Sequence, residues 1–340
     1  MKTAQFYHIR EDGKLQCLLC PHLCTPAEGK AGKCRVRRHV NGEMISETYQ
    51  KVSAVHYDPI EKKPLYHFYP GSTILSIGSI GCNLNCSFCQ NCDISTADFS
   101  GSSWCKEYLA EDLVSMGIDF PGNIGIAFTY NEPTMSYEFI MEVSRLASSM
   151  GMKTAMVSNG FINPDPLIQL LPFIDAYNVD LKAFRDEFFI ENTNSRLAPV
   201  IETLRILKET GKHFEITNLV IPGLNDDPEI FTEMIDWIAG ELGEYTVLHL
   251  SRYFPHHKLT IKATPAETLQ NFYGIAREKL HYVYLGNVSS GEGQNTFCPH
   301  CGELLISRSG YKTKLIGINH DAPGDARCLK CNTPIQNLLI

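Results

Sequence analysis

Four cysteines fall within twelve residues of this chain, in the stretch GCNLNCSFCQNC at positions 81–92. Cysteines so close in sequence rarely reach the geometry of a disulfide bridge. The chain has 13 cysteines in all and starts with MKTAQFYHIREDGK, which lacks the apolar run of a secretory signal. We therefore expect a reducing, cytoplasmic environment, in which clustered thiols indicate metals or iron–sulfur clusters.

The cysteines form three sets. The first set, with the spacing C-x2-C-x3-C-x9-C, is Cys17, Cys20, Cys24 and Cys34. The second is Cys82, Cys86, Cys89 and Cys92. The last set, with the spacing C-x2-C-x26-C-x2-C, is Cys298, Cys301, Cys328 and Cys331. Four thiolates closed to substrate fit zinc, and they fit an auxiliary iron–sulfur cluster equally well at the first set, where His22 is an alternative ligand. The last set predicts a zinc-ribbon or rubredoxin-like module that holds zinc or a single iron.

Composition excludes several other classes of protein. The 340 residues are 44% hydrophobic and 20% charged, which is ordinary for a globular protein. The formal net charge of −8 argues against nucleic acid as the main partner, because phosphate binding needs a basic surface. No stretch is apolar and long enough to span a bilayer, so we expect no membrane partner.

Between the terminal cysteine sets, short apolar runs alternate with amphipathic stretches. Strands are predicted at 73–80, 123–130, 153–159, 176–184, 213–222, 246–253 and 282–288, with helical patterns between several of them. Such repetition predicts an α/β fold with a parallel sheet covered by helices. Six or seven units are too few for an eight-fold barrel, so we expect a partial (βα)6-type barrel at 51–292, flanked by a cysteine-rich module at 1–50 and the second metal module at 293–340.

The central cysteine loop directly follows the first predicted barrel strand. Cys82, Cys86 and Cys89 supply three thiolates, one short of the four that normally fill an iron–sulfur cluster, so one iron would stay open to another ligand. A structural zinc knuckle with Cys92 as the fourth ligand is the alternative. Because barrels keep their active sites at the carboxyl ends of the strands, the position favours the open cluster.

The loop CNLNCSFCQN resembles the cluster loop of the radical S-adenosylmethionine (SAM) superfamily, and three further strand ends continue the resemblance. FTYNEPT (128–134), VSNG (157–160) and NVDLK (178–182) are similar to family segments that hold SAM. Together with CLLCPHLCTPAEGKAGKCRVR (17–37) and EKKPLYHFYPG (61–71), they resemble most closely the AmmeMemoRadiSam-system branch, which is related to pyruvate formate-lyase activating enzyme.

The resemblance implies a [4Fe–4S] cluster on the three loop cysteines, with SAM bound to its open iron. Reductive cleavage of SAM would release a 5′-deoxyadenosyl radical that abstracts hydrogen from a protein or small-molecule substrate, with a low-potential ferredoxin- or flavodoxin-type electron donor. The SAM contacts expected from the strand ends are Asn131, Glu132, Ser158, Asn159, Asp180, Lys182 and His249.

Two of these assignments compete with ordinary structural roles. Asp180 and Lys182 are two apart, so they share one face of a strand and would form either a structural ion pair or a cradle for a zwitterion. His249 would be either a ligand of the cofactor or a core histidine. Lys62, Lys63 and His67 would either line a pocket for a substrate phosphate or carboxylate or belong to a solvent-facing arm of the chain. The rival class is a metal-binding redox or interaction protein without SAM chemistry.

Overall fold

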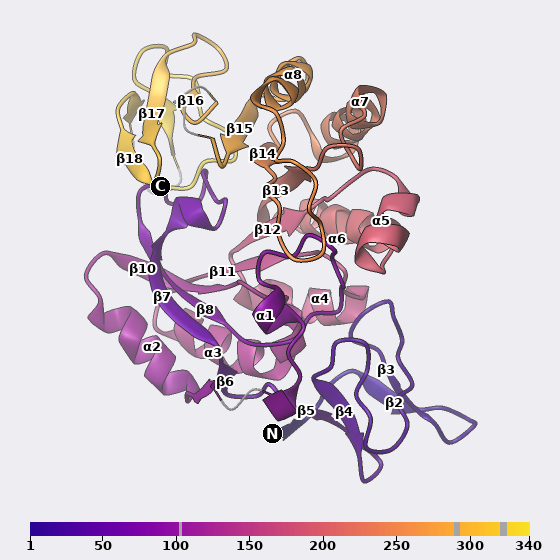
Figure 1. Ribbon diagram of the computed structural model, residues 1–340. Coiled ribbons are helices and arrows are strands. Elements are labelled where there is room, and N and C mark those ends of the chain that lie inside the picture. Colours follow the sequence, from indigo (N-terminus) through magenta and orange to yellow (C-terminus); the bar gives the residue numbers. More distant parts are fainter. Residues whose placement is uncertain (102–103, 289–292, 320–324) are drawn as a thin grey trace.

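The computed structural model describes residues 1–101, 104–288, 293–319 and 325–340 (Figure 1). Its centre is an eight-stranded sheet in the order β15-β14-β13-β12-β11-β10-β8-β7, in which only β7 runs antiparallel to its neighbour. The bounds are β7 (Ala54–Pro59), β8 (Thr73–Gly78), β10 (Asn123–Phe128), β11 (Lys153–Ser158), β12 (Ala176–Asp180), β13 (His213–Val220), β14 (Val247–Arg252) and β15 (Tyr282–Gly286).

The sheet confirms the expected partial barrel. Each predicted strand contains an observed parallel strand, and the two edges, β7 and β15, do not pair with each other. The observed strands stop earlier than predicted; the run at 176–184, for example, is a strand only as far as Asp180. The chain leaves the sheet at these points, which frees the residues of the strand-end motifs to line a cavity. The antiparallel strand β7 was not predicted.

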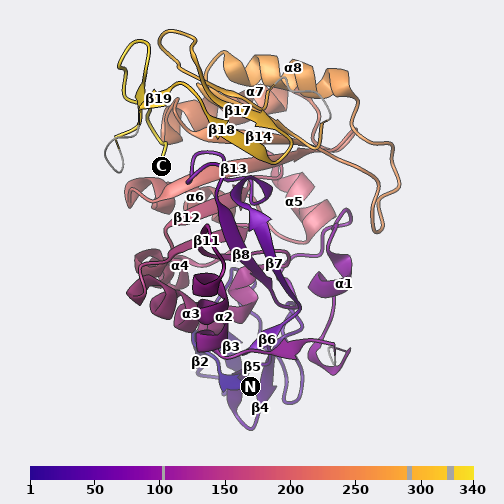
Figure 2. The ribbon, with the colours of Figure 1, turned by 90° about the vertical axis from the view of Figure 1, so that its left-hand side faces the viewer.

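Helices cover the outer face of the sheet (Figures 1 and 2). They are α2 (Ala110–Asp119), α3 (Tyr137–Ser149), α4 (Pro164–Leu170), α5 (Asp186–Thr193), α6 (Ala198–Glu209), α7 (Pro228–Trp237) and α8 (Ala266–Arg277), with the short α1 (Cys92–Ser95) after the cysteine loop. Local sequence explains where they begin: at α7 the carboxylate of Asp227 accepts hydrogen bonds from the backbone N–H groups of Glu229 and Ile230, and Pro228 occupies the first turn.

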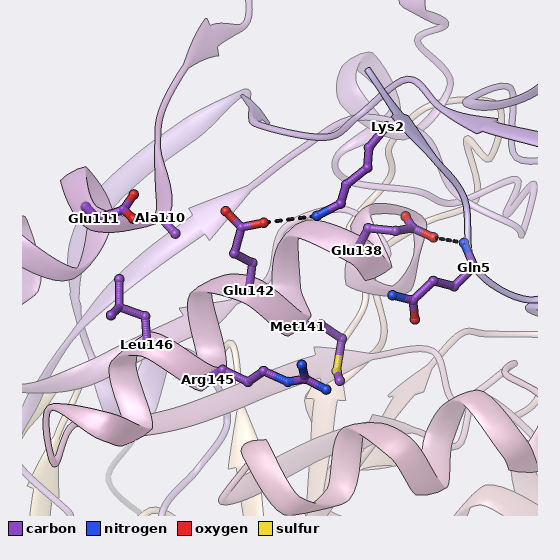
Figure 3. A pocket seen from close by; sticks show the side chains of 9 residues that line it. All are labelled: Lys2, Gln5, Ala110, Glu111, Glu138, Met141, Glu142, Arg145 and Leu146. Atoms are coloured by element: carbon purple, nitrogen blue, oxygen red, sulfur yellow. Dashed lines mark hydrogen bonds and ion pairs between the residues drawn. The ribbon is translucent and has the colours of Figure 1, made fainter.

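The N-terminal module is built from short strands. β1 (Lys2–Thr3), β5 (Glu43–Ser46) and β4 (Arg37–Val40) form one sheet, and β2 (Tyr7–Ile9) pairs with β3 (Leu15–Cys17). Outside residues 1–50, the short β6 (Lys51–Val52) pairs with β9 (Lys106–Glu107). The module is anchored on α3, where the buried guanidinium of Arg37 lies 2.9 Å from Oε1 of Glu138. The backbone N–H of Gln5 donates to the same oxygen at 2.8 Å, and Lys2 pairs with Glu142 beside a cavity of about 440 Å³ (Figure 3).

The C-terminal module lies at the opposite end of the molecule (Figures 1 and 2). Its strands are β16 (Thr296–Phe297), β17 (Leu304–Ser309), β18 (Lys312–Leu315), β19 (Ile318–Asn319) and β20 (Arg327–Cys328). Arg308, which is buried, fastens it to the segment 61–71 by donating to the backbone carbonyl of Tyr66 at 2.7 Å. Thr313 also donates to the Glu61 carboxylate at 2.7 Å.

Candidate active site

A cavity of about 620 Å³ opens at the carboxyl ends of the parallel strands. Every residue predicted for the cluster and for SAM lines it: Cys82, Cys86, Cys89, Asn131, Glu132, Ser158, Asn159, Asp180, Lys182 and His249. They come from segments spread over about half of the chain, from Cys82 to His249. The topology brings them together because the strands that precede them are neighbours in one parallel sheet.

The cysteine loop is held in place by backbone hydrogen bonds to the C-terminal end of α5. The N–H of Asn85 donates to the carbonyl of Thr193 at 2.9 Å, and that of Ser87 donates to Asn192 at 3.0 Å. The N–H of Leu84 points at Sγ of Cys82, 3.3 Å away. The loop therefore presents its thiols from a fixed backbone, as a cluster-binding loop requires.

Cys92 does not belong to this group of thiols. It begins α1, is absent from the cavity lining, and its Sγ lies 3.8 Å from Nε2 of His256.

Burial raises the pKa of the Cys86 thiol to about 11, and burial together with the charge of Glu132 raises the pKa of Cys82. Thiols in such an environment become thiolates when a bound cation compensates their charge.

Glu132 is the buried centre of a hydrogen-bond network behind the cysteine loop. Its Oε1 accepts from the hydroxyls of Ser158 at 2.9 Å and Thr134 at 2.8 Å, and its Oε2 accepts from the backbone N–H of Asn159 at 2.8 Å. Burial outweighs these hydrogen bonds and raises the pKa of the carboxyl group. Through both of its oxygens, Glu132 ties the segment after β10 to the end of β11.

The two asparagines have mainly structural roles. Oδ1 of Asn131 accepts from the N–H of Ser79 at 2.9 Å and its Nδ2 donates to the carbonyl of Gly81 at 2.9 Å, which fixes the start of the cysteine loop. Nδ2 of Asn159 donates to Oδ1 of Asn83 at 2.9 Å and lies 3.7 Å from Sγ of Cys82. These side chains position the loop in addition to lining the cavity.

Asp180 and Lys182 line the same cavity as the three loop thiols. Nζ of Lys182 lies 2.7 Å from Oδ2 of Asp180, with Lys182 mostly covered and Asp180 about one third exposed. Burial opposes the positive charge of Lys182, but the Asp180 carboxylate and the neighbouring Cys86 thiol outweigh it and raise the pKa of Lys182. The ammonium group is therefore charged at neutral pH and lies beside a partly open carboxylate.

His249 lies in the cavity wall but is bound from behind. Its Nε2 lies 2.6 Å from Oε2 of the fully buried Glu215, and Oε1 of Glu215 lies 3.1 Å from Nε2 of His213. Glu215 also accepts from the backbone N–H groups of Tyr66 and His67. His249 is thus part of a core network and also lines the cavity, and its role as a ligand of the cofactor stays a prediction.

The segment 61–71 contributes a charged wall that the sequence did not fully reveal. Lys62 and Lys63 line the cavity, and their Nζ atoms lie 2.8 and 2.7 Å from the two oxygens of Asp58. The hydroxyl of Tyr130 donates a hydrogen bond to Asp58 at 2.6 Å. Tyr130 itself has φ of 74°, in the left-handed region. His67, by contrast, is buried away from the cavity, with Nε2 2.6 Å from the hydroxyl of Tyr284.

Asp58 and Tyr130 were missed because neither residue stands out in the sequence. Asp58 lies at the end of the unpredicted strand β7, and Tyr130 precedes the motif residues Asn131 and Glu132. Tyr311, from the turn between β17 and β18, also reaches this cavity, so the C-terminal module contributes to the site. No pattern in the sequence connects residue 311 with the barrel.

The terminal cysteine sets differ in geometry. Cys298, Cys301, Cys328 and Cys331 bring all four Sγ atoms within 4.8 Å of one another. Cys298 and Cys331 are 3.6 Å apart, as are Cys301 and Cys328. Tetrahedral zinc with Zn–S bonds of about 2.3 Å places its sulfurs about 3.8 Å apart, so this set fits a mononuclear metal site. The module is consistent with the predicted metal-binding role.

The N-terminal set surrounds a small internal cavity of its own. Cys17, Cys20, Cys24 and Cys34 line it with apolar residues and with His22. Nε2 of His22 lies 2.7 Å from the carbonyl of Asn83, and its Nδ1 lies 3.4 Å from Nζ of Lys33. Both ring nitrogens of His22 are thus already engaged, and the residue connects this module to the cysteine loop.

Comparison with known proteins identifies the family. The sequence model of the radical SAM superfamily matches residues 76–237, which contain the cysteine loop and the strand ends at Glu132, Ser158 and Asp180. An uncharacterized protein of Methanocaldococcus jannaschii, MJ0808, is 40% identical over 341 residues and covers 100% of both chains. The chain belongs to the radical SAM superfamily. Enzymes of this superfamily use a [4Fe–4S] cluster and SAM, as the sequence predicted.

Other relatives place the chain within the superfamily more loosely. The pyruvate formate-lyase 1-activating enzyme of Escherichia coli K12 is 26% identical over 229 residues, which cover 60% of this chain and 88% of that enzyme. A radical SAM methyltransferase from Sphaerobacter thermophilus shares the fold, with a TM-score of 0.51, 19% identity and coverage of 70% and 71% of the two chains. The resemblance of this radical SAM protein to the AmmeMemoRadiSam-system branch stays a prediction.

Within the described residues of this radical SAM protein, no helix has both the length and the apolar character needed to cross a membrane.

Proposed function

We propose that this protein is a radical SAM enzyme that generates a 5′-deoxyadenosyl radical in the cavity at the strand ends and uses it to abstract hydrogen from a protein or small-molecule substrate. The observation that carries the proposal is the cavity itself, which is lined by three loop thiols and by a paired carboxylate and ammonium. An electron carrier without SAM chemistry has no use for such a zwitterion cradle, which disfavours the rival class.

The residues present fit a [4Fe–4S] cluster held by Cys82, Cys86 and Cys89. The three thiols line one cavity of about 620 Å³, which leaves room for a cluster beside them, and three thiolates leave one of four irons open to a further ligand. When bound, the cluster supplies the electron that cleaves SAM and leaves one iron for the amino and carboxylate groups of its methionine moiety.

The remaining residues bind and orient SAM in this proposal. The ammonium of Lys182 attracts the SAM carboxylate. Oε2 of Glu132 and the carboxylate of Asp180 accept hydrogen bonds from the amino group and the ribose hydroxyl groups of SAM. Asn131 and Asn159 hold the loop, and Ser158 and His249 complete the wall. The domain boundaries 1–50, 51–292 and 293–340 and a cytoplasmic location are part of the same proposal.

The reaction class beyond radical formation is proposed from the relatives. The activating enzyme of E. coli supports an activase-like role, in which the hydrogen is taken from a partner protein. A low-potential ferredoxin- or flavodoxin-type protein would supply the electron. Zinc or iron at the terminal cysteine sets completes the metal inventory, and neither nucleic acid nor a membrane is expected as a partner.

The proposal is tested on anaerobically reconstituted protein with dithionite and SAM, by chromatographic analysis of 5′-deoxyadenosine. We expect this product to form only when iron, sulfide, reductant and SAM are all present. A fully iron-loaded protein that binds no SAM and yields no 5′-deoxyadenosine after reduction would instead support the redox or interaction protein.

Lys182→Met is expected to weaken SAM binding by about 10-fold or more, equivalent to about 1.4 kcal/mol, because the SAM carboxylate would lose its charged partner. Equilibrium dialysis with the iron-loaded protein measures the effect. Lys262→Met removes an exposed lysine outside the cavity and serves as the matched control. Equal SAM affinity in the two variants would contradict the role of Lys182. Glu132 is a poorer position for this test, because its replacement would also break the hydrogen bonds that it accepts from Ser158 and Asn159.

A further inference from the structure

Two lysines of the charged wall share one carboxylate. Nζ of Lys62 lies 2.8 Å from Oδ1 of Asp58, and Nζ of Lys63 lies 2.7 Å from Oδ2. Oδ2 also accepts a hydrogen bond from the hydroxyl of Tyr130 at 2.6 Å. A single carboxylate balances only one of the two ammonium charges. The wall therefore brings one excess positive charge to the cavity of about 620 Å³ that both lysines line.

The ammonium groups of these lysines also have hydrogen-bond donors to spare. Each ammonium has three N–H donors, and among the described residues the only acceptor of Lys62 and Lys63 is Asp58. The side chain of Lys63 is 2% exposed, and its burial lowers the pKa of Lys63 in spite of Asp58. A buried charge with unused donors is unfavourable until a further partner compensates it.

The carboxylates that line the cavity have partners of their own. Oε1 of Glu61 lies 3.9 Å from Nε of the buried Arg308, and Oδ2 of Asp180 lies 2.7 Å from Nζ of Lys182. Both oxygens of Glu132 accept hydrogen bonds from neighbouring hydroxyl and backbone N–H groups. The negative charge that matches the two lysines of the wall is therefore expected from a ligand.

A neutral donor lies in the same wall. Tyr66 lines the cavity, and burial raises the pKa of its hydroxyl to about 12, so the hydroxyl keeps its proton at neutral pH. The ring of Tyr66 is held between the guanidinium of Arg308, 4.4 Å from the ring centre, and the ring of His249, 4.8 Å away. Ammonium and hydroxyl donors together are suited to the oxygens of a carboxylate or a phosphate.

The charged wall lies in a part of the cavity away from the cysteine loop. Asp58 pairs with Ile74 in the register of β7 and β8, whereas the cysteine loop comes after Gly78, at the other end of β8. The strand between Ile74 and Gly78 is about 13 Å long at about 3.3 Å per residue. Lys182, by contrast, follows the carboxyl end of β12. The wall is thus distinct from the lysine expected to bind SAM.

We propose that Lys62 and Lys63, together with Tyr66, bind a carboxylate or phosphate group of the substrate and hold it in the part of the cavity away from the cluster. This inference rests on the proposed function, because it names a binding element for the substrate of the same site. Lys63 provides a fixed, buried charge, and the half-exposed Lys62 provides the second donor. A substrate without an anionic group would leave the excess charge of the wall uncompensated.

The anion site is tested by equilibrium dialysis of iron-loaded protein with radiolabelled inorganic phosphate and with radiolabelled acetate. We expect saturable binding of at least one of them, which also tells phosphate from carboxylate recognition. Lys62→Met should weaken this binding about 10-fold or more, because Asp58 then balances Lys63 and the excess charge is gone. Lys62 is 46% exposed, so its replacement spares the core. Lys262→Met, outside the cavity, should bind like wild type.

Saturable binding of neither anion, or equal binding by wild type and Lys62→Met, would overturn the proposal. A second measurement separates this site from that of SAM. Lys182→Met should bind phosphate as tightly as wild type, and saturating SAM should not displace phosphate. Displacement by SAM, or loss of phosphate binding in Lys182→Met, would place the anion at Lys182 and contradict the proposal. Binding is measured without turnover, so an anion site in a protein that cleaves no SAM would refute the proposed function alone.

Discussion

Replacing Cys86 with serine is expected to reduce 5′-deoxyadenosine formation by more than about 100-fold, because a hard hydroxyl ligand at the centre of the loop does not retain a cluster iron and the electron source for SAM cleavage is lost with it. Cys86 lines the same cavity as Lys182 and also packs against the small buried cluster of Cys20, Leu84 and Phe161, and serine is close to cysteine in size, so the substitution changes the ligand atom with little change in packing. The measurement is the product yield per chain after reduction, together with the iron content.

Cys92→Ser provides the matched control, six residues further along the same loop. Cys92 is outside the cavity lining, so this variant should keep the iron content and the activity of the wild-type protein. Equal loss of iron in both variants would mean that Cys92 is a ligand, as in a four-thiolate knuckle. Retention of activity in Cys86→Ser would remove the loop from the proposed mechanism altogether.

Glu215→Leu is expected to lower the free energy of unfolding by about 3–5 kcal/mol and the thermal midpoint by roughly 5–10 °C. The carboxylate is fully buried and accepts from His213, His249 and the backbone N–H groups of Tyr66 and His67. Leucine would leave all four donors without partners. Calorimetry or circular dichroism of metal-loaded protein measures the shift, and Glu233→Gln, at an exposed pair with Arg185, should stay within about 1 °C.

The effect of Glu215 should depend on pH. Burial alone would raise its pKa, but the hydrogen bonds and charges of His213 and His249 outweigh burial and lower the pKa below the usual range. A carboxyl group with a lowered folded pKa stabilises the protein above its unfolded pKa of about 4.3 and loses this contribution as the pH falls toward the folded value. The difference between wild type and Glu215→Leu should therefore be full at pH 7 and shrink below about pH 4. A constant difference would contradict this origin.

The sequence revealed the site better than it revealed the supports of the site. Cys82, Glu132, Ser158 and Asp180 each follow an apolar run, so the rule that parallel strands end at one edge was enough to predict that they meet. The same rule says nothing about Glu215, which lies within a strand and becomes important only through two histidines and two backbone donors on other elements.

The charged wall was predicted only in part for a similar reason. Lys62 and Lys63 stand out as a dipeptide, but their partner Asp58 is defined by strand pairing of β7 with β8, which depends on register and not on composition. The C-terminal thiols could be predicted as a metal site from spacing alone. The contact between the N-terminal thiols and the barrel loop could not, because it is made by Leu84, Phe161 and the backbone of Gly81.

The way the segment 61–71 is held also has a consequence for biosynthesis. Its partners lie far downstream: Glu215 is 149 residues after Tyr66, Tyr284 is 217 residues after His67, and Arg308 is 242 residues after Tyr66. A ribosome produces this segment early, yet Glu215 emerges well over 100 residues later, and Tyr284 and Arg308 emerge only in the last part of the chain. The barrel strands can pair in order as they appear, whereas the wall that carries Lys62 and Lys63 reaches its native position among the last parts of the molecule.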